Sequence, residues 1–334
     1  MIIIQTLIIE SAARPTGNRG SVALEVVLSK PLHTMPYLVI YKESFYPDTP
    51  DPATSYTIHP FASTGNTFLF ELPNQDEPKY FSLVRKEGDG IGYLMKNYHF
   101  EPGDNIVVNI DNSNAHIACC PVFSGAGAAK YRCLTEIRNR ILFDEVRLLP
   151  QFNVIYLYNI DNRNIRNIHL ALTVLKKFKP ELSDYSYELL KVDIMAKEWS
   201  VLISNFKHKM AAALQNDDTY AYLRVCYEYE SKLKLDLEMP VSGTVQYSSL
   251  AYAHFKVEKI VFVYLKKYIK INFVKIYYQI YLEKDCILRD KMIVILLMRY
   301  KTEMKGNYSS LIKHAITHLK DKKCLDKLMS MLLL

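Results

Sequence analysis

A chain of 334 residues, 49% of them hydrophobic, is long enough to bury a large core, and this length favours two domains over one. The composition excludes a disordered or fibrous protein. The net charge of +7 is modest, and lysines and aromatic residues form no recognisable nucleic-acid-binding module, so we expect no nucleic-acid partner.

The first residues, MIIIQTLIIESAARP, combine an apolar run with Ser11, Ala12 and Ala13. An apolar run before small residues is typical of the end of a secretory signal peptide, but the basic segment that normally precedes it is absent. Two interpretations stay open: a signal peptide whose start is mis-assigned, or a first β-strand. We expect no transmembrane span, because lysines interrupt the apolar sequence around Met292–Met298.

Up to about residue 122, short apolar runs alternate with turn residues, which is the pattern of an antiparallel sheet. A turn at Pro102 and Gly103 separates a strand that ends at Phe100 from one that begins near Asn105. The apolar runs are VALEVVLS, PYLVIYKES, SYTIHPF, NTFLFELP, KYFSLVRK and NIVVNID, the last being the strand that begins near Asn105. We therefore predict that residues 1–122 form an antiparallel β-sandwich or small barrel.

The segment FSGAGAAKYRC, residues 123–133, places Gly125 and Gly127 before a lysine. A phosphate-binding P-loop requires a GKS or GKT run, and a dinucleotide-binding fingerprint requires a third glycine within a βαβ unit. Neither pattern is present. We predict that the two glycines form a tight junction between the last strand and the first long helix, because glycine accepts positive φ without steric cost.

From residue 123 to the end, apolar residues recur at helical spacing. In the first helix Leu134, Ile137, Ile141 and Leu142 are expected to form the buried face. Further helices are expected over Asn164–Phe178, Asp184–Leu214, Thr219–Leu235, Ser248–Ile269, Val274–Glu283, Ile287–Thr302, Ser309–Leu319 and Leu325–Leu333. Residues 123–334 are therefore predicted to form an all-α domain, solenoid-like or an irregular bundle, which makes the fold class α+β.

Local signals mark where some of these helices begin. Ser183 is a candidate N-cap for the helix at Asp184, and Gly306 with Asn307 separates two later helices. Asp217 and Asp218 precede Thr219, so we interpret them as turn and cap residues rather than as a general acid and base.

His314 and His318 stand one helical turn apart, a spacing that can place two imidazoles on one metal ion. No third ligand is adjacent in the sequence and the glutamate of the HExxH motif is absent, so we expect a surface or core pair. No GxSxG motif indicates a hydrolase. We predict no catalytic residue, no cofactor and no metal site.

The six cysteines show neither metal-ligand spacing nor the CxxC motif of redox sites. They are Cys119, Cys120, Cys133, Cys226, Cys286 and Cys324. Because a buried free cysteine behaves as a small hydrophobic residue, we expect all six to be structural thiols.

Tyrosine is abundant, with 25 residues. Tyr220, Leu223 and Tyr227 share one face at helical spacing, and we expect this face to belong to the core, with hydrated hydroxyl groups. The alternative is a helix face that binds a protein partner, because aromatic residues favour interfaces.

The last eighty residues, 255–334, hold 17 Lys and Arg against 7 Asp and Glu. We interpret this excess as solvated helix faces; an acidic partner surface or an anionic lipid is the alternative. In the final helix four apolar residues lie beside lysines, and we predict that they bind a protein partner, either a thioredoxin-like domain or a second copy. The four are Leu325, Leu328, Met329 and Leu332.

Two runs carry a family resemblance. FEPGDNIVVNIDNS, followed by FSGAGAAKYRCLTEI, resembles the N-terminal, non-thioredoxin region of envelope thiol-disulfide oxidoreductases of the TlpA/ResA type. The resemblance is specific over Phe100–Ile137 and extends in layout over about residues 20–330. In that family a β-rich domain and a helical segment precede a thioredoxin domain with CxxC. The resemblance implies a periplasmic or cell-envelope location; a cytoplasmic location stays open.

The chain departs from that family in its redox motif. It contains no CxxC and ends about where the thioredoxin domain would begin, so the redox residues of the family have no matching positions. The resemblance thus implies a non-catalytic accessory portion of an envelope thiol-disulfide oxidoreductase system, with the thioredoxin domain missing or supplied separately. The alternative is a freestanding helical protein-binding scaffold with no redox role.

Overall fold

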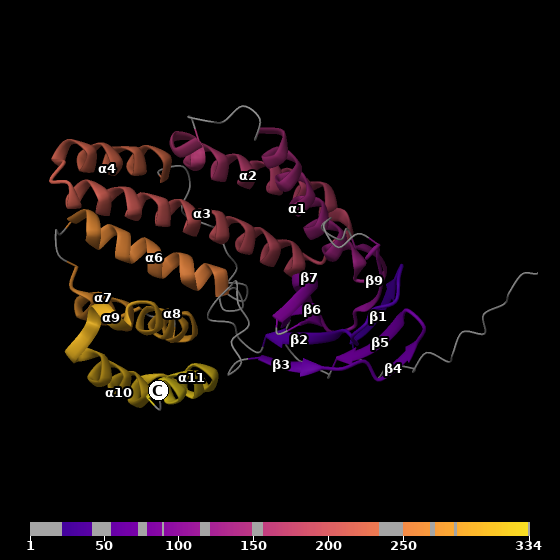
Figure 1. Ribbon diagram of the computed structural model, residues 1–334. Helices are drawn as coiled ribbons and strands as arrows, with labels where there is room; N and C mark the ends of the chain where they lie inside the picture. Colours follow the sequence, from indigo (N-terminus) through magenta and orange to yellow (C-terminus); the bar gives the residue numbers. More distant parts are fainter. Residues whose placement is uncertain are drawn as a thin grey trace, which may run out of the picture. The chain divides into compact units, whose positions relative to one another are not determined.

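A computed structural model describes residues 22–41, 55–72, 79–88, 90–113, 121–148, 156–233, 250–267, 271–283 and 286–332 (Figure 1). The chain divides into two compact units: residues 1–38 with 58–128, and residues 39–57 with 129–334. The fold class is α+β, as predicted, with strands in the N-terminal part and helices after it. The expectation for the first residues, a signal peptide or a first strand, lies outside the described residues.

The strands form two sheets, and neither closes on itself, so the sandwich and not the small barrel is adopted. One sheet has the order β4-β5-β1-β8-β9 and the other β3-β2-β6-β7. The strands are β1 (Val22–Leu28), β2 (Tyr37–Tyr41), β3 (Ser55–Ile58), β4 (Ala62–Thr64), β5 (Thr67–Leu72), β6 (Lys79–Glu87), β7 (Gly90–Phe100), β8 (Asn105–Ile110) and β9 (Val122–Ala126).

Strand β1 lies at the centre of the larger sheet. Val26 pairs with Phe68 of β5 on one side and with Val108 of β8 on the other, and all three side chains are buried. The β1–β8 pair is parallel, so the prediction of a purely antiparallel sheet is wrong at this pair. A parallel pair requires a long crossover, and the chain between β1 and β8 provides one that includes strands of both sheets.

Aromatic side chains on the inner faces of the two sheets pack against one another and join the sheets into a sandwich. The ring of Tyr98 on β7 lies 5.4 Å from that of Phe123 on β9, and these two strands belong to different sheets. Within the smaller sheet the rings of Phe81 and Phe100 are 5.9 Å apart. All four of these aromatic residues are buried.

The strand-to-helix junction is a glycine hinge, as predicted. Gly125 has φ +98° and Gly127 has φ +82°, and a Cβ atom on either would overlap the main-chain oxygen of Asn105 or the carboxylate of Asp104. The same Asp104 accepts a hydrogen bond from the main-chain nitrogen of Glu101 (2.9 Å), which closes the Pro-Gly turn. Strand β9 pairs with β8 as far as Ala126, and α1 begins at Ala128.

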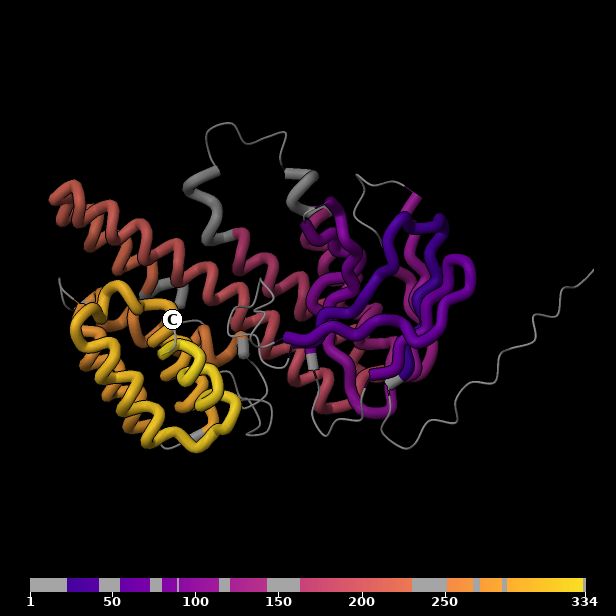
Figure 2. The backbone as a smooth tube through the Cα atoms, turned by 60° about the horizontal axis from the view of Figure 1, so that its bottom comes forward, coloured from indigo at the N-terminus to yellow at the C-terminus, as the bar shows by residue number. Residues whose placement is uncertain are grey.

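The second unit is mostly helical (Figure 2). Some of its helices pack on the next one in the chain, such as α2 on α3 and α3 on α4, and others on a more distant one, such as α3 on α6 and α6 on α8. Two short 3-10 helices, Lys179–Glu181 and Lys305–Asn307, lie between longer ones. The helices are α1 (Ala128–Leu148), α2 (Tyr156–Phe178), α3 (Asp184–Gln215), α4 (Thr219–Leu233), α6 (Leu250–Lys267), α7 (Phe273–Tyr281), α8 (Cys286–Arg299), α9 (Lys301–Met304), α10 (Tyr308–His318) and α11 (Lys322–Leu332).

Two local predictions for the helices have different outcomes. Ser183 caps α3, since its hydroxyl accepts a hydrogen bond from the main-chain nitrogen of Ser186 (3.0 Å). On α1, Ile137 is buried as expected, but Leu142 is 50% exposed, so its assignment to the buried face is wrong. Adjacent residues on a helix point about 100° apart, and Ile141 lies nearer to the buried stripe.

A buried carboxylate connects three helices of this unit. Glu258 on α6 accepts hydrogen bonds from Lys207 on α3 (2.7 Å) and from Arg299 on α8 (2.5 Å). The Tyr300 hydroxyl also donates to this carboxylate (3.1 Å). Burial raises the pKa of Glu258, but the two cations and the hydrogen bonds outweigh it and hold this pKa below the ordinary value.

Among the described helices, none is both long and apolar enough to cross a membrane.

Candidate interaction surface

Helix α4 follows α3 through a tight turn that the sequence predicted. Asp217 has φ +51°, and the carboxylate of Asp218 accepts a hydrogen bond from the main-chain nitrogen of Ala221 (2.9 Å). The two aspartates are thus turn and cap residues, as expected, because short polar side chains tolerate positive φ and satisfy the free N–H groups of a helix start.

The inner face of α4 is firmly packed. The ring of Tyr229 stacks on Phe262 of α6 with centroids 3.7 Å apart and meets the edge of Phe206 of α3 at 5.5 Å. Val225 and Cys226 are buried in the same cluster. Burial raises the pKa of Tyr229 to about 12, so this phenol stays neutral at physiological pH.

A second tyrosine anchors α4 to the end of α6. The Tyr222 hydroxyl donates to the main-chain oxygens of Leu265 (3.0 Å) and Lys266 (3.2 Å). These contacts occupy carbonyls near a helix end, which have no partner within the helix. Packing and hydrogen bonds together hold α4 in one orientation relative to α3 and α6.

The outer face of α4 carries three large side chains that do not contact the core. Tyr220 is 79% exposed, Leu223 60% and Tyr227 72%. The expectation that this face belongs to the core is wrong for these three residues, which we call the α4 stripe. Tyr222, Val225, Cys226 and Tyr229 already fill the contact with α3 and α6, and the stripe lies on the opposite side.

The α4 stripe has the chemistry of a binding surface. Two tyrosines and a leucine at these exposures present on the order of 400 Å² of mostly apolar surface, the size of a functional patch on a soluble protein. Beside it, Arg224 and Glu228 form an ion pair (3.1 Å) and leave little net charge. A rigid helix with exposed tyrosines is suited to fill apolar pockets on another protein.

The partner-binding residues predicted on α11 divide into two pairs. Leu328 is fully buried, and Leu325 is partly buried against the same cluster. Met329 and Leu332 are exposed. The helix folds back on its own unit, so Leu328 is not accessible to a partner in this structure.

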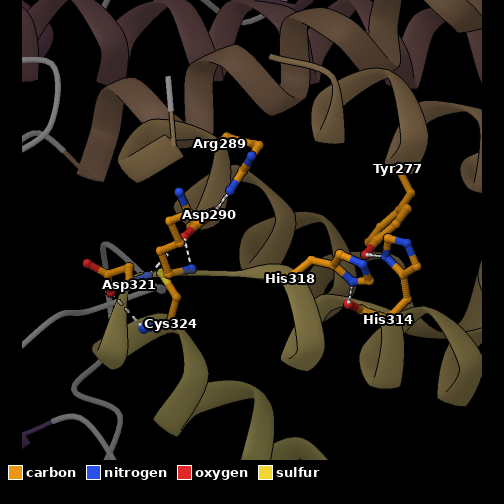
Figure 3. A network of polar contacts seen from close by, with 8 residues as sticks. Tyr277, Arg289, Asp290, His314, His318, Asp321 and Cys324 are labelled. Atoms are coloured by element: carbon orange, nitrogen blue, oxygen red, sulfur yellow. Dashed lines mark hydrogen bonds and ion pairs between the residues drawn. The ribbon is translucent and has the colours of Figure 1, made fainter. Parts of the chain in front are cut away.

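A buried aspartate holds α11 in that position (Figure 3). Asp290 of α8 pairs with Arg289 (2.8 Å) and accepts hydrogen bonds from the main-chain nitrogens of Lys320 (2.8 Å) and Asp321 (3.0 Å). Asp321 in turn caps α11 at the main-chain nitrogen of Cys324 (2.9 Å). These contacts position the start of α11 on α8.

Three cysteines can be placed with their side chains, and all three are buried free thiols, as expected: Cys133, Cys226 and Cys324. Burial, with a smaller effect from Glu136, raises the pKa of Cys133 to about 12. A thiol with so high a pKa is a poor nucleophile at physiological pH. Cys119 and Cys120 lie outside the described residues, as does the side chain of Cys286.

His314 and His318 lie with their rings stacked, 4.2 Å between centroids, and His318 is exposed while His314 is partly buried (Figure 3). Within the described ranges, no group of three or more His, Cys, Asp and Glu side chains is arranged to hold a metal ion.

A cavity of about 330 Å³ lies between α6 and α7. The cavity is lined by two lysines, a glutamate, a glutamine and three largely apolar side chains: Lys256, Lys259, Glu283, Gln279, Ile260, Val263 and Tyr264. This set contains no nucleophile with an adjacent base, so it does not indicate a catalytic site.

No protein-family model matches the chain, and no curated protein matches it. The resemblance to TlpA/ResA-type oxidoreductases therefore stays a prediction from the sequence.

Proposed function

We propose that this protein is a non-catalytic protein-binding module that presents the α4 stripe to a partner. The observation that carries the proposal is the exposure of Tyr220, Leu223 and Tyr227 on a helix whose other face is anchored by Tyr222 and Tyr229. A fixed helix loses little entropy on binding, and exposed tyrosines are typical interface anchors.

A protein partner fits this surface better than a lipid or a small molecule. The stripe projects from a helix rather than lining a pocket, and small ligands bind in concave sites. An anionic membrane would require an excess of basic residues, whereas Arg224 is balanced by Glu228. The partner would offer an apolar groove that accepts residues spaced by three and four positions.

The sequence resemblance indicates the class of partner. In this proposal the chain is the accessory portion of an envelope thiol-disulfide oxidoreductase system, and a thioredoxin-like domain supplies the redox chemistry. The high pKa of Cys133 is consistent with a chain that leaves thiol exchange to another domain. The proposed location is the periplasm or cell envelope.

A direct test is calorimetric titration of the chain with a purified thioredoxin domain of a TlpA/ResA-type enzyme. We expect binding by the wild type and at least a tenfold loss, about 1.4 kcal/mol, in Tyr220→Ser/Tyr227→Ser. Tyr93→Ser is the matched control, because Tyr93 is a partly exposed tyrosine on β7. Absence of binding by the wild type contradicts the redox-accessory role.

The second candidate is a freestanding helical scaffold, favoured by the same stripe. It predicts a partner that is not a thioredoxin-like domain. A photo-crosslinking residue at position 223, introduced in the native host, distinguishes the two roles by the identity of the crosslinked protein. A crosslink that persists unchanged in Tyr220→Ser/Tyr227→Ser contradicts both.

A further inference from the structure

The last three helices present more positive than negative charge to solvent. Over residues 301–332 six lysines are exposed, against two acidic residues. The lysines are Lys301, Lys305, Lys313, Lys320, Lys322 and Lys323, and the acidic residues are Glu303 and Asp326. This excess distinguishes α9–α11 from α4, where Arg224 is balanced by Glu228.

Three of these lysines lie together between α10 and α11. Lys320 is in the turn, and Lys322 and Lys323 are the first two residues of α11. The acidic residue of the turn, Asp321, accepts a hydrogen bond from the main-chain nitrogen of Cys324 (2.9 Å), and Asp290 fixes the turn through main-chain nitrogens (Figure 3). The turn is therefore held by main-chain contacts, while the three lysine side chains extend into solvent.

The position of Lys322 and Lys323 does not favour the fold. The N-terminus of a helix carries partial positive charge, so cations there are unfavourable and anions are favourable. The first turn of α11 contains no acidic residue. Replacing these lysines by neutral residues should therefore leave the helix folded, and their charge is available for an anionic partner.

Exposed apolar side chains follow the lysines on the same helix. Met329 is 52% exposed and Leu332 39%, whereas Cys324 and Leu328 are buried on the inner side of α11. Lys322 and Met329 are about two helical turns apart and so lie on the same side. Asp326 is exposed between them and reduces the positive charge without cancelling it.

We propose that Lys320, Lys322, Lys323, Met329 and Leu332, the α11 surface, bind the surface of a membrane that contains anionic phospholipids. Lysines close to such a leaflet are attracted by its negative surface potential, each strengthening binding by roughly fivefold. Met329 and Leu332 enter the boundary between headgroups and acyl chains, as the apolar side chains of interfacial helices do.

A membrane suits the α11 surface better than an acidic protein does. Its cations are all lysines, which act as flexible point charges, whereas arginine is the residue that recognises single carboxylates with two hydrogen bonds. A lipid surface offers many equivalent phosphates and an apolar layer below them, so it matches both the lysines and the two exposed apolar side chains.

The test is sedimentation of the full chain with vesicles of phosphatidylcholine alone, and of phosphatidylcholine and phosphatidylglycerol in equal amounts. We expect binding to the anionic vesicles, weakened by added salt because salt screens the lysines. Lys320→Gln/Lys322→Gln/Lys323→Gln should weaken it at least tenfold. The main-chain contacts of the turn remain in this variant, and circular dichroism checks its fold.

Lys176→Gln/Lys177→Gln/Lys179→Gln is the matched control. These lysines are also exposed and grouped at the end of a helix, but Lys177 pairs with Glu136 (3.4 Å). This variant should bind the anionic vesicles as the wild type does. No binding by the wild type, equal binding to both kinds of vesicle, or equal losses in the two triple variants overturns the proposal.

The apolar contact has its own pair of variants. Met329→Ser should weaken vesicle binding by about two- to fivefold, because a side chain that enters the acyl boundary is lost. Met35→Ser is the control, since Met35 is 54% exposed and lies outside the helical unit, and it should have no effect. Unchanged binding in Met329→Ser contradicts the placement of α11 against the membrane.

Discussion

Helices α4 and α8 are both rich in apolar residues, yet they end in different environments. In α8 every residue from Met292 to Leu297 is essentially inaccessible, because α6, α7, α10 and α11 pack around it. Helix α4 lies along α3 (Figure 1). Only its face that meets α3 and α6 is covered, and Tyr220 and Tyr227 are exposed. The number of helices that pack around each of the two decides how much of it becomes core.

This difference separates side chains that stabilise the fold from side chains available for binding. Burying a large apolar side chain contributes about 1.5–3 kcal/mol relative to leaving it exposed. The burial of Tyr229 on α4 and of the apolar residues of α8 stabilises the fold by amounts of this order. The side chains of the α4 stripe are exposed, so replacing them should weaken binding and leave the free energy of unfolding nearly unchanged.

The largest contrast is expected within α4 itself. Tyr229→Ala should lower the free energy of unfolding by about 3–5 kcal/mol, because it leaves a cavity between Phe206 and Phe262. Tyr220→Ala on the outer face should change it by less than about 0.5 kcal/mol. Urea unfolding followed by circular dichroism measures both. Equal losses in the two variants would refute the assignment of inner and outer faces.

Leucine occurs in both α4 and α8, so the same substitution can be used to compare the two helices. Leu296→Ala in α8 should cost about 2–5 kcal/mol, and Leu223→Ala in α4 less than about 0.5 kcal/mol. Both changes remove the same atoms and alter helix propensity alike, so the difference between their costs reports the burial of the side chain. A cost below 1 kcal/mol for Leu296→Ala would show that α8 is not enclosed as described.

The enclosed region also contains the buried carboxylate of Glu258. Because its pKa is lower in the folded chain than its ordinary value of 4.5, its ionisation stabilises the fold above that pH. This stability is lost as the pH falls through the depressed pKa. Glu258→Gln should lower the free energy of unfolding at pH 7 by about 1–3 kcal/mol and reduce the acid dependence.

Glu228→Gln is the matched control for that measurement, since Glu228 forms a surface pair with Arg224 and should contribute about 0–1 kcal/mol. Unfolding curves at pH 7 and at pH 3 to 4 provide the comparison. If the wild type and Glu258→Gln lose the same stability between these pH values, Glu258 does not titrate as inferred.

The smallest effect expected is on a rate rather than on stability. In Tyr227→Cys a thiol on the α4 stripe should react readily with iodoacetamide at pH 8, while the adjacent Cys226 stays slow because burial raises its pKa. Peptide mass spectrometry after timed labelling distinguishes the two neighbours. Comparable rates would mean that the α4 surface opens frequently.

The sequence by itself determined the local structure of this protein well. Helical spacing predicted α3 over Asp184–Leu214 against an observed Asp184–Gln215, and Ser183 was identified as its cap. Glycine at the strand-to-helix junction was also predictable, since positive φ and close main-chain approach are properties of a few adjacent residues. Such signals depend on contacts within a few positions of the chain.

Tertiary structure alone decided what each apolar face meets. The parallel pairing of β1 with β8, the exposure of the α4 stripe and the burial of Leu328 all depend on segments distant in sequence. The contact of the Tyr277 hydroxyl with the His314 ring likewise joins two helices that no motif connects. Periodicity indicates that a helix has an apolar face, but the neighbours that cover this face, or leave it bare, are set by packing.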